Sequence, residues 1–238
     1  MMNKRQVLQL LTLLVLTLTA FKSFAGDPLK NASHFKFALI IPKTDFGKFN
    51  NGLGQPDTNG IIPYQHISAS TGFGVQFGKM FYFKPLNATE TMNIGMDVTW
   101  FGLSYLKTKY HVSYSMIMDH ITVFFEVGPM FNYYISESMT IDASFKLTPT
   151  IGFIGGGDTK NPAPVEGENW LIGTSFGLRY TPALYFRFNE YILGAEYSLG
   201  GLSFNYNIQN YGGRSYPSDY ETGRSPYSTL RIVLGVQF

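Results

Sequence analysis

The sequence predicts an all-β fold, an eight-stranded antiparallel up-and-down transmembrane β-barrel with short periplasmic turns and long extracellular loops. Three observations predict it. The chain starts with the layout of a secretory signal, and after that apolar and polar residues alternate along eight segments. The connections between these segments are alternately long and short, which is the asymmetry of outer-membrane barrels. Alternation with a period of two places one set of side chains toward lipid and the other toward a lumen.

The N-terminus predicts a cleaved signal peptide over residues 1–25. Lys4 and Arg5 precede an apolar run from Val7 to Phe21, and Ser23 and Ala25 are small residues at the positions that precede a cleavage site. The run is shorter than the roughly twenty residues that a membrane-spanning helix needs. Residues 26–33 would then be a short periplasmic segment, and residues 34–238 would form the barrel.

Composition excludes several classes of protein. The chain contains no Cys, so a lipid-anchored lipoprotein and a disulfide framework are both excluded. Removing Lys4, Arg5 and Lys22 with the signal changes 18 basic and 16 acidic residues to 15 and 16. Nucleic-acid binding, which needs a basic face, is therefore not expected. The 21 Phe and 16 Tyr residues fit a β-rich chain whose apolar residues are dispersed by alternation.

The first half of the barrel region contains four expected strands. They are 34–41, 65–83, 92–105 and 121–135, separated by a long loop at 43–63, a short turn at 84–90 and a polar segment at 107–120. The polar segment could also lengthen either neighbouring strand. Lys79 falls on the apolar face of the second strand, where it would reach for the membrane interface or mark a bulge.

Four more strands are expected in the second half. They are 141–153, 170–180, 191–199 and 227–238, with connections at 136–138, 155–169, 188–190 and 206–226. Gly200-Gly201 is expected to shift the phase of alternation through a bulge. Pro129, Pro149 and Pro182 lack an N–H for the ladder, so bulges or strand ends are expected there.

The terminal strand carries the most specific pattern. Its outward set would be Leu230, Ile232, Leu234, Val236 and Phe238, and its inward set Thr229, Arg231, Gly235 and Gln237, with Val233 the one exception. This strand resembles the closing strand of Gram-negative outer-membrane barrels, in which a terminal aromatic with alternating apolar residues is read by the barrel-assembly machinery. An unclosed strand edge cannot persist in lipid, so the other strands must complete a ring.

Charged residues of the expected strands, apart from Lys79, fall on the inward face. Four are basic and four are acidic: Lys36, Asp97, Glu126, Asp142, Lys146, Arg179, Glu196 and Arg231. The interior of an eight-stranded barrel is just wide enough for its own side chains, so these charges would be desolvated and would have to pair. They would close the lumen as a plug, or alternatively they would form a gate on a narrow proton or ion path.

No catalytic, cofactor or metal site is expected. His66-Ile67-Ser68 and His111-Val112-Ser113, with Glu126 downstream, resemble the His-x-Ser pair and Glu of lipid A deacylases, but alternation places His66 and Glu126 toward the lumen rather than the lipid. Gly155-Gly156-Gly157-Asp158 lacks the Lys-Ser/Thr and the helix of a phosphate-binding loop. The four His residues are scattered along the chain.

The last loop, 206–226, is the expected recognition surface. Tyr211, Arg214, Tyr216 and Tyr220 stand among Gly, Ser and Asn, and Tyr supplies amphipathic contact area at low entropic cost. The alternative is a loop that packs on its own rim.

Residues 34–238 as a whole resemble the small eight-stranded outer-membrane barrels of the OmpA, OmpX and OmpW type, without a periplasmic domain. The resemblance implies an integral outer-membrane protein whose partners are outer-membrane lipid and lipopolysaccharide, the barrel-assembly machinery, and an unidentified extracellular ligand or protein. The expected role is non-enzymatic, structural or in surface interaction. The alternatives are a narrow channel for small or apolar solutes and, less favoured, a lipid A-modifying barrel enzyme.

Overall fold

The computed structural model describes residues 32–43, 46–49, 65–85, 91–111, 115–158, 168–211 and 221–238. The expected signal peptide lies outside these residues. Within them, no helix is long and apolar enough to cross a membrane. Ala32 and Ser33, expected in the periplasmic segment, already belong to the first strand.

The described residues form one sheet of eleven antiparallel strands. The strands are β1 Ala32–Pro42, β2 Phe46–Phe49, β3 Gln65–Ala69, β4 Gly72–Pro85, β5 Met92–His111, β6 Ser115–Ser136, β7 Met139–Asp158, β8 Glu168–Phe188, β9 Tyr191–Tyr211, β10 Glu221–Pro226 and β11 Thr229–Gln237. Three of them are short continuations of a longer neighbour: β3 pairs with β5 beside β4, β10 pairs with β9 beside β11, and β2 follows β1 and pairs with β3. We call each of the eight long strands, together with any short strand that continues it, a stave; the sheet therefore has eight staves.

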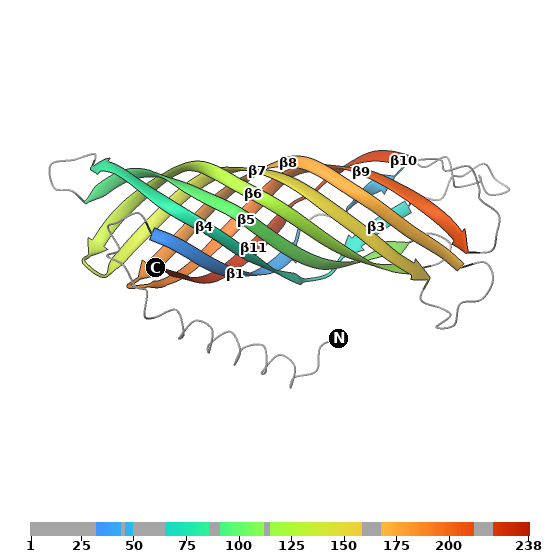
Figure 1. Ribbon diagram of the computed structural model, residues 1–238, viewed down its shortest axis with the longest axis horizontal. Helices are drawn as coiled ribbons and strands as arrows, with labels where there is room; N and C mark the ends of the chain where they lie inside the picture. The colour runs from blue at the N-terminus through green and yellow to red at the C-terminus, as the bar shows by residue number, and fades with distance from the viewer. Residues whose placement is uncertain are drawn as a thin grey trace, which may run out of the picture.

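The staves close into a ring in the order β1, β4, β5, β6, β7, β8, β9 and β11, because β5 pairs with β6 and β11 returns to β1. Figure 1 shows the barrel along its length, with the C-terminus and the start of β1 at one end and β3 and β10 toward the other. We call the first end the turn end, since the two-residue turns Glu137-Ser138 and Asn189-Glu190 lie there. The opposite end is the loop end. The expected eight-stranded antiparallel barrel is confirmed.

The barrel closes where its first strand, β1, pairs with its last strand, β11, and we call this ladder the closing seam. Nine register pairs join β1 to β11, from His34 opposite Gln237 to Pro42 opposite Thr229. Beyond them, Ser33 and Phe238 exchange two backbone hydrogen bonds of 2.9 and 2.8 Å. The Phe238 ring packs against Phe77 with a centroid distance of 6.2 Å. The C-terminal residue is thus part of the seam.

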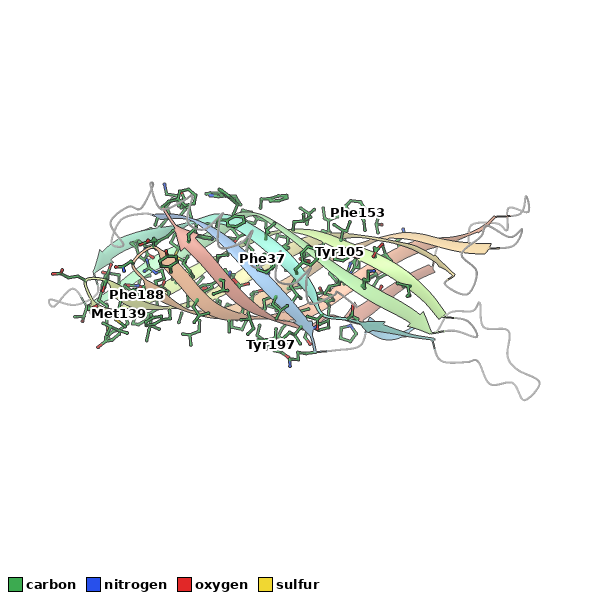
Figure 2. The ribbon with its side chains drawn as sticks, turned by 90° about the horizontal axis from the view of Figure 1, so that it is seen from below. Phe37, Tyr105, Met139, Phe153, Phe188 and Tyr197 are labelled. Atoms are coloured by element: carbon green, nitrogen blue, oxygen red, sulfur yellow. The ribbon has the colours of Figure 1, made fainter. Side chains whose placement is uncertain are left out.

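The outer wall of the barrel is apolar around its whole circumference. Large side chains that are more than a third exposed come from all eight staves, for example Leu39, Phe73, Trp100, Phe131, Phe145, Phe176, Leu193 and Leu234. Figure 2 shows Met139 and Phe188 at the turn end, with Tyr105 and Phe153 farther along the wall. A continuous exposed apolar band of this kind would be unstable in water and fits a membrane-spanning barrel.

Two expectations about the strands are wrong, and one open alternative is decided. The long loop at 43–63 contains the short strand β2. The described residues of the polar segment 107–120 lengthen both neighbouring strands, β5 and β6, which was the alternative to a loop. Gly200-Gly201 produces no phase shift, because β8 and β9 keep one register from Tyr180–Leu199 to Leu178–Gly201. Gly200 is instead the point where β9 changes partner from β11 to β10, and its backbone φ is 155°.

The phase shift that does occur was not expected. Between Thr99 and Gly102 the register of β5 slips against β6, and on the β4 side Trp100 is an extra residue between Thr99 and Phe101. Trp100 and Phe101 both face outward and are about half exposed. Beyond this bulge the even-numbered residues of β5 point inward.

Pro129, Pro149 and Pro182 cause neither bulges nor strand ends. The β6–β7 ladder lacks pairs around Pro129 and Pro149, and the β8–β9 ladder lacks them around Pro182, yet each register resumes unchanged. In an antiparallel strand each N–H points to one neighbour only, so a proline removes one bond on one side. The ladder on the other side continues, as in the pair Phe145–Pro182.

Candidate functional site

The lumen holds a layer of polar side chains to which every stave contributes one residue. We call this layer the central ring: Lys36 from β1, Gln76 from β4, Asp97 from β5, Glu126 from β6, Lys146 from β7, Tyr185 from β8, Glu196 from β9 and Arg231 from β11. All eight side chains are buried, with exposures of 0–2%. Six of the eight charged residues that alternation assigned to the lumen lie here, although they come from distant parts of the sequence.

Lys146 is the hub of the central ring. Its Nζ lies 2.6 Å from Glu126, 3.1 Å from Glu196 and 3.5 Å from Asp97, and it donates to the Tyr185 hydroxyl at 2.9 Å. A single ammonium group therefore contacts all three carboxylates of the layer. Opposite charges at these distances in a desolvated interior attract strongly, which offsets the cost of burying them.

The remaining contacts link the other staves to the same carboxylates. Arg231 bridges Glu126 at 2.5 Å and Glu196 at 2.7 Å. Gln76 donates to Glu196 at 2.8 Å, Lys36 donates to the Tyr185 hydroxyl at 3.0 Å, and that hydroxyl donates to Glu196. The result is a cross-lumen network in which no stave is left out.

Asp97 is the most loosely held member of the ring. Its nearest cationic partners are Lys146 at 3.5 Å and Lys36 at 3.7 Å, and the His34 imidazole stands 3.9 Å away. Among the described residues, neither carboxylate oxygen of Asp97 has a hydrogen-bond partner, and neither ring nitrogen of His34 has one. The network is thus tight around Glu126 and Glu196 and looser on the β1–β5 side.

A second cluster lies at the turn end, and sequence reasoning missed its centre. Arg187 pairs with Asp142 through two nitrogens and donates to Gln237 at 2.8 Å, while Gln237 donates to the Asn189 carbonyl at 2.8 Å. Asn132 also donates to Asp142. Because Pro182 was expected to limit the strand, the inward positions after Tyr180 were not counted. Extending the alternation through Pro182 would have found Arg187.

Arg179 is also buried in the lumen, and its surroundings differ from those of the other cations. Its Nε donates to the Thr150 hydroxyl at 3.0 Å. Its guanidinium carbon stands 5.0 Å from the centre of the Tyr227 ring and 5.7 Å from that of Phe124. In the described part of the chain, no carboxylate oxygen lies within 4.0 Å of this guanidinium.

Toward the loop end, the inner and outer faces of the barrel wall reverse their polarity. The inward residues become apolar: Leu106, Met118, Ile154, Leu202, Phe204 and Tyr227 are all buried and belong to one cluster. Most of the described outward residues become polar, with Ile117 an exception: Lys107, Asp119, Thr174, Ser203 and Asn205 are exposed. An apolar inside with a polar outside is the pattern of a barrel in water, so this outer section stands beyond the apolar band.

One of the histidines whose side chains are described, His120, lies inside the outer section. The His120 ring packs near Phe204 and Tyr227, with centroid distances of 6.2 and 6.3 Å, and its Nε2 is 3.3 Å from the Ser175 hydroxyl. This histidine and serine are buried among apolar side chains, and sequence reasoning had not singled them out. Among the described residues, no group of three or more metal-ligating side chains was found.

The other expected sites are only partly described. On the terminal strand, Ile232 and Leu234 are exposed on the outer wall, Leu230 and Phe238 are half-buried, and Val236 is buried. Arg214, Tyr216 and Tyr220, and the side chain of Tyr211, lie outside the described residues. The ladder pairs His66 with His111, so the two His-x-Ser tripeptides begin on adjacent strands, but their side chains are not described. Glu126 is part of the central ring.

No protein-family model matches the chain, and no curated protein matches it. It is similar in outline to the outer membrane protein OprG from Pseudomonas aeruginosa, with 10% identity, a TM-score of 0.49 and coverage of 88% of this chain and 96% of that one. For the outer membrane protein AlkL, solved in lipid bilayers, the identity is 12% and the TM-score 0.40, with coverage of 88% of this chain and 90% of that one. For the translocator domain of the autotransporter NalP from Neisseria meningitidis, the identity is 9% and the TM-score 0.20, with coverage of 98% of each chain. The eight-stave barrel is established by the strand pairing of this chain itself.

Proposed function

We propose that the protein is a non-enzymatic outer-membrane barrel whose lumen is closed and whose role is structural or in surface interaction. The observation that carries the proposal is the central ring. Each stave places one buried polar side chain in the same layer, and the contacts cross the lumen. A solute would have to break several desolvated ion pairs to pass, so the layer acts as a plug.

The orientation in the membrane follows from the two ends. Short turns mark the periplasmic end of outer-membrane barrels, and longer loops mark the extracellular end. The turn end would then face the periplasm, and the outer section would stand above the outer leaflet, in reach of lipopolysaccharide. Its polar outer wall and the adjoining loops would meet an extracellular ligand or protein.

A second candidate function is a narrow path for small apolar solutes, and the apolar interior of the outer section favours it. Met118, Leu202 and Phe204 would provide an apolar environment at the loop end. These side chains are closely packed, however, and the central ring lies beyond them. This path would therefore require both layers to open.

Planar-bilayer conductance of the refolded barrel separates the two candidates. Heat-modifiable gel mobility would first show that the protein is folded. We expect a silent bilayer from the wild-type protein, and no unitary steps after Arg179→Gln. Reproducible steps in the wild-type protein, with a conductance that changes in Glu196→Gln or Arg179→Gln, would reject the closed barrel and favour the channel.

A further inference from the structure

The charged side chains buried in the lumen do not balance. The basic ones are Lys36, Lys146, Arg179, Arg187 and Arg231, and the acidic ones are Asp97, Glu126, Asp142 and Glu196. That is five cations and four anions in the described part of the barrel, where sequence reasoning expected four of each. With the two buried histidines neutral, one positive charge is in excess.

The contacts identify which cation is in excess. Asp142 pairs with Arg187, and Glu126 pairs with Lys146 and Arg231. Glu196 pairs with Lys146, Arg231 and Lys36, and Asp97 pairs with Lys146 and Lys36. Each of the four carboxylates thus already has a cationic partner. Arg179 is the one described lumen cation with no carboxylate within 4.0 Å.

None of the described neighbours of Arg179 forms an ion pair with it. Thr150 accepts one hydrogen bond from Nε, and the Tyr227 and Phe124 rings offer their faces. The nearby hydroxyls are engaged elsewhere: Thr148 and Thr181 are 2.8 Å apart, and Thr181 and Ser198 are 3.0 Å apart. A guanidinium presents five N–H donors in a planar fork that suits an anion, and Nε uses one of them here.

The local backbone makes room for this side chain. Arg179 is opposite Gly200 in the β8–β9 ladder. A Cβ on Gly200 would come within 2.9 Å of the Arg179 Cα and 3.0 Å of its Cγ. The missing side chain at Gly200 therefore lets the Arg179 stem enter the lumen between the central ring and the apolar cluster of the outer section.

We infer that Arg179 holds a small monovalent anion in the lumen, at the junction between the central ring and the outer section. The ligand would be of halide or short-carboxylate size, because Arg179 is only 2% exposed and is enclosed by the Thr150 hydroxyl and the Tyr227 and Phe124 rings. It would bind the terminal guanidinium nitrogens and make the buried charge neutral. The inference concerns ligand binding and holds whether or not the barrel conducts.

Bromide tests the site directly, because its anomalous scattering identifies it in crystals. Barrel refolded and crystallised in sodium bromide should show an anomalous peak beside the Arg179 guanidinium, and Arg179→Gln should lose it. Lys79→Gln is the matched control, since Lys79 is a cation on the outer wall beside Phe81. This control should retain the peak. A wild-type crystal without a peak at Arg179 would overturn the inference.

Thermal unfolding provides a solution measurement. At constant ionic strength, replacing bulky gluconate by chloride should raise the unfolding midpoint of the wild-type barrel, because a ligand that binds only the folded state stabilises it. Arg179→Gln should abolish the rise. The same rise with acetate would show that any small monoanion binds, and a rise with chloride alone would identify a halide site. An equal rise in Arg179→Gln would overturn the inference, and if that variant does not fold, the wild-type bromide crystal decides.

Discussion

At the scale of single residues, the lumen depends most on Lys146. Replacing it by Met would leave Glu126, Glu196 and Asp97 without their shared partner in a desolvated layer. Removing one member of a buried ion-pair network typically costs about 3–5 kcal/mol. We expect Lys146→Met to lower the free energy of unfolding by that amount, measured by urea unfolding in lipid vesicles.

The control for this variant is Lys79→Met. Lys79 lies on the outer wall with its ammonium 5.5 Å from the centre of the Phe81 ring, so the same chemical change leaves the lumen intact. We expect little loss of stability from it. Similar unfolding curves for the two variants would mean that the central ring contributes no more than an outer-wall lysine does.

Gly200 offers a second test at the residue scale. Its φ of 155° is one that side chains with a Cβ rarely adopt, and an added Cβ would lie 2.7 Å from the Leu178 carbonyl oxygen. Gly200→Ala should therefore cost about 1–3 kcal/mol of unfolding free energy. Gly155→Ala is the matched control, since among the described residues no atom beyond its two chain neighbours lies within 4 Å of its Cβ position. Equal unfolding midpoints for the two alanine variants would contradict this account.

At the scale of elements, the contribution of Phe238 to the closing seam between β1 and β11 can be divided into that of its aromatic ring and that of its backbone. Phe238 contributes an aromatic contact with Phe77 and two backbone hydrogen bonds with Ser33. Phe238→Ala keeps the backbone bonds, whereas deletion of Phe238 removes both. We expect the alanine variant to refold in detergent with a yield close to that of the wild type, and the deletion to refold with a lower yield. The gel-mobility shift of the folded barrel measures both.

The same two variants test the expectation that the terminal strand is an assembly signal. In cells, Phe238→Ala should lower the amount of barrel in the outer membrane even though it refolds in detergent. Membrane levels equal to those of the wild type would show that the terminal aromatic is not read during assembly.

At the scale of the whole molecule, three adjacent staves are interrupted where the barrel passes into its outer section. The breaks follow β1, precede β4 at Ser70-Thr71 and precede β11 at Tyr227-Ser228. Cooperative units of a fold open separately where few contacts join them. We expect backbone amides of β3 and β10 to exchange with solvent faster than those of β4 and β11. Mass spectrometry of the barrel in lipid would measure this, and uniform protection along each stave would contradict it.

Much of the architecture could be predicted from the sequence because it depends on local order along the chain. Alternation fixes which side of a strand each residue occupies, and a charge on the lipid face is costly, so Glu126 and Arg231 could be assigned to the interior. The prediction failed where a local rule was too strict. Pro182 was expected to mark a bulge or a strand end, but it removes only one ladder bond, and the inward Arg187 was missed as a result.

The polar segment at 107–120 was ambiguous for a physical reason as well. Strands above the membrane have polar residues outside and apolar residues inside, the reverse of the pattern within lipid, so this segment did not fit the lipid-facing template. Leu106 and Met118 face inward there, and Lys107 and Asp119 face outward. Recognising the reversal requires knowing where the apolar band ends, which depends on all eight staves together.

By itself, the sequence determined the number of staves, most of the inward and outward sets, and eight of the nine charges described in the lumen, because each follows from the period of a single strand. Only the tertiary structure decided which charges meet. Register and ring closure bring Lys146, Glu196 and Arg231 into one layer, and they place Arg179 opposite Gly200, with no described carboxylate oxygen within 4.0 Å. These relations join residues far apart in the chain, so no local pattern could have set them.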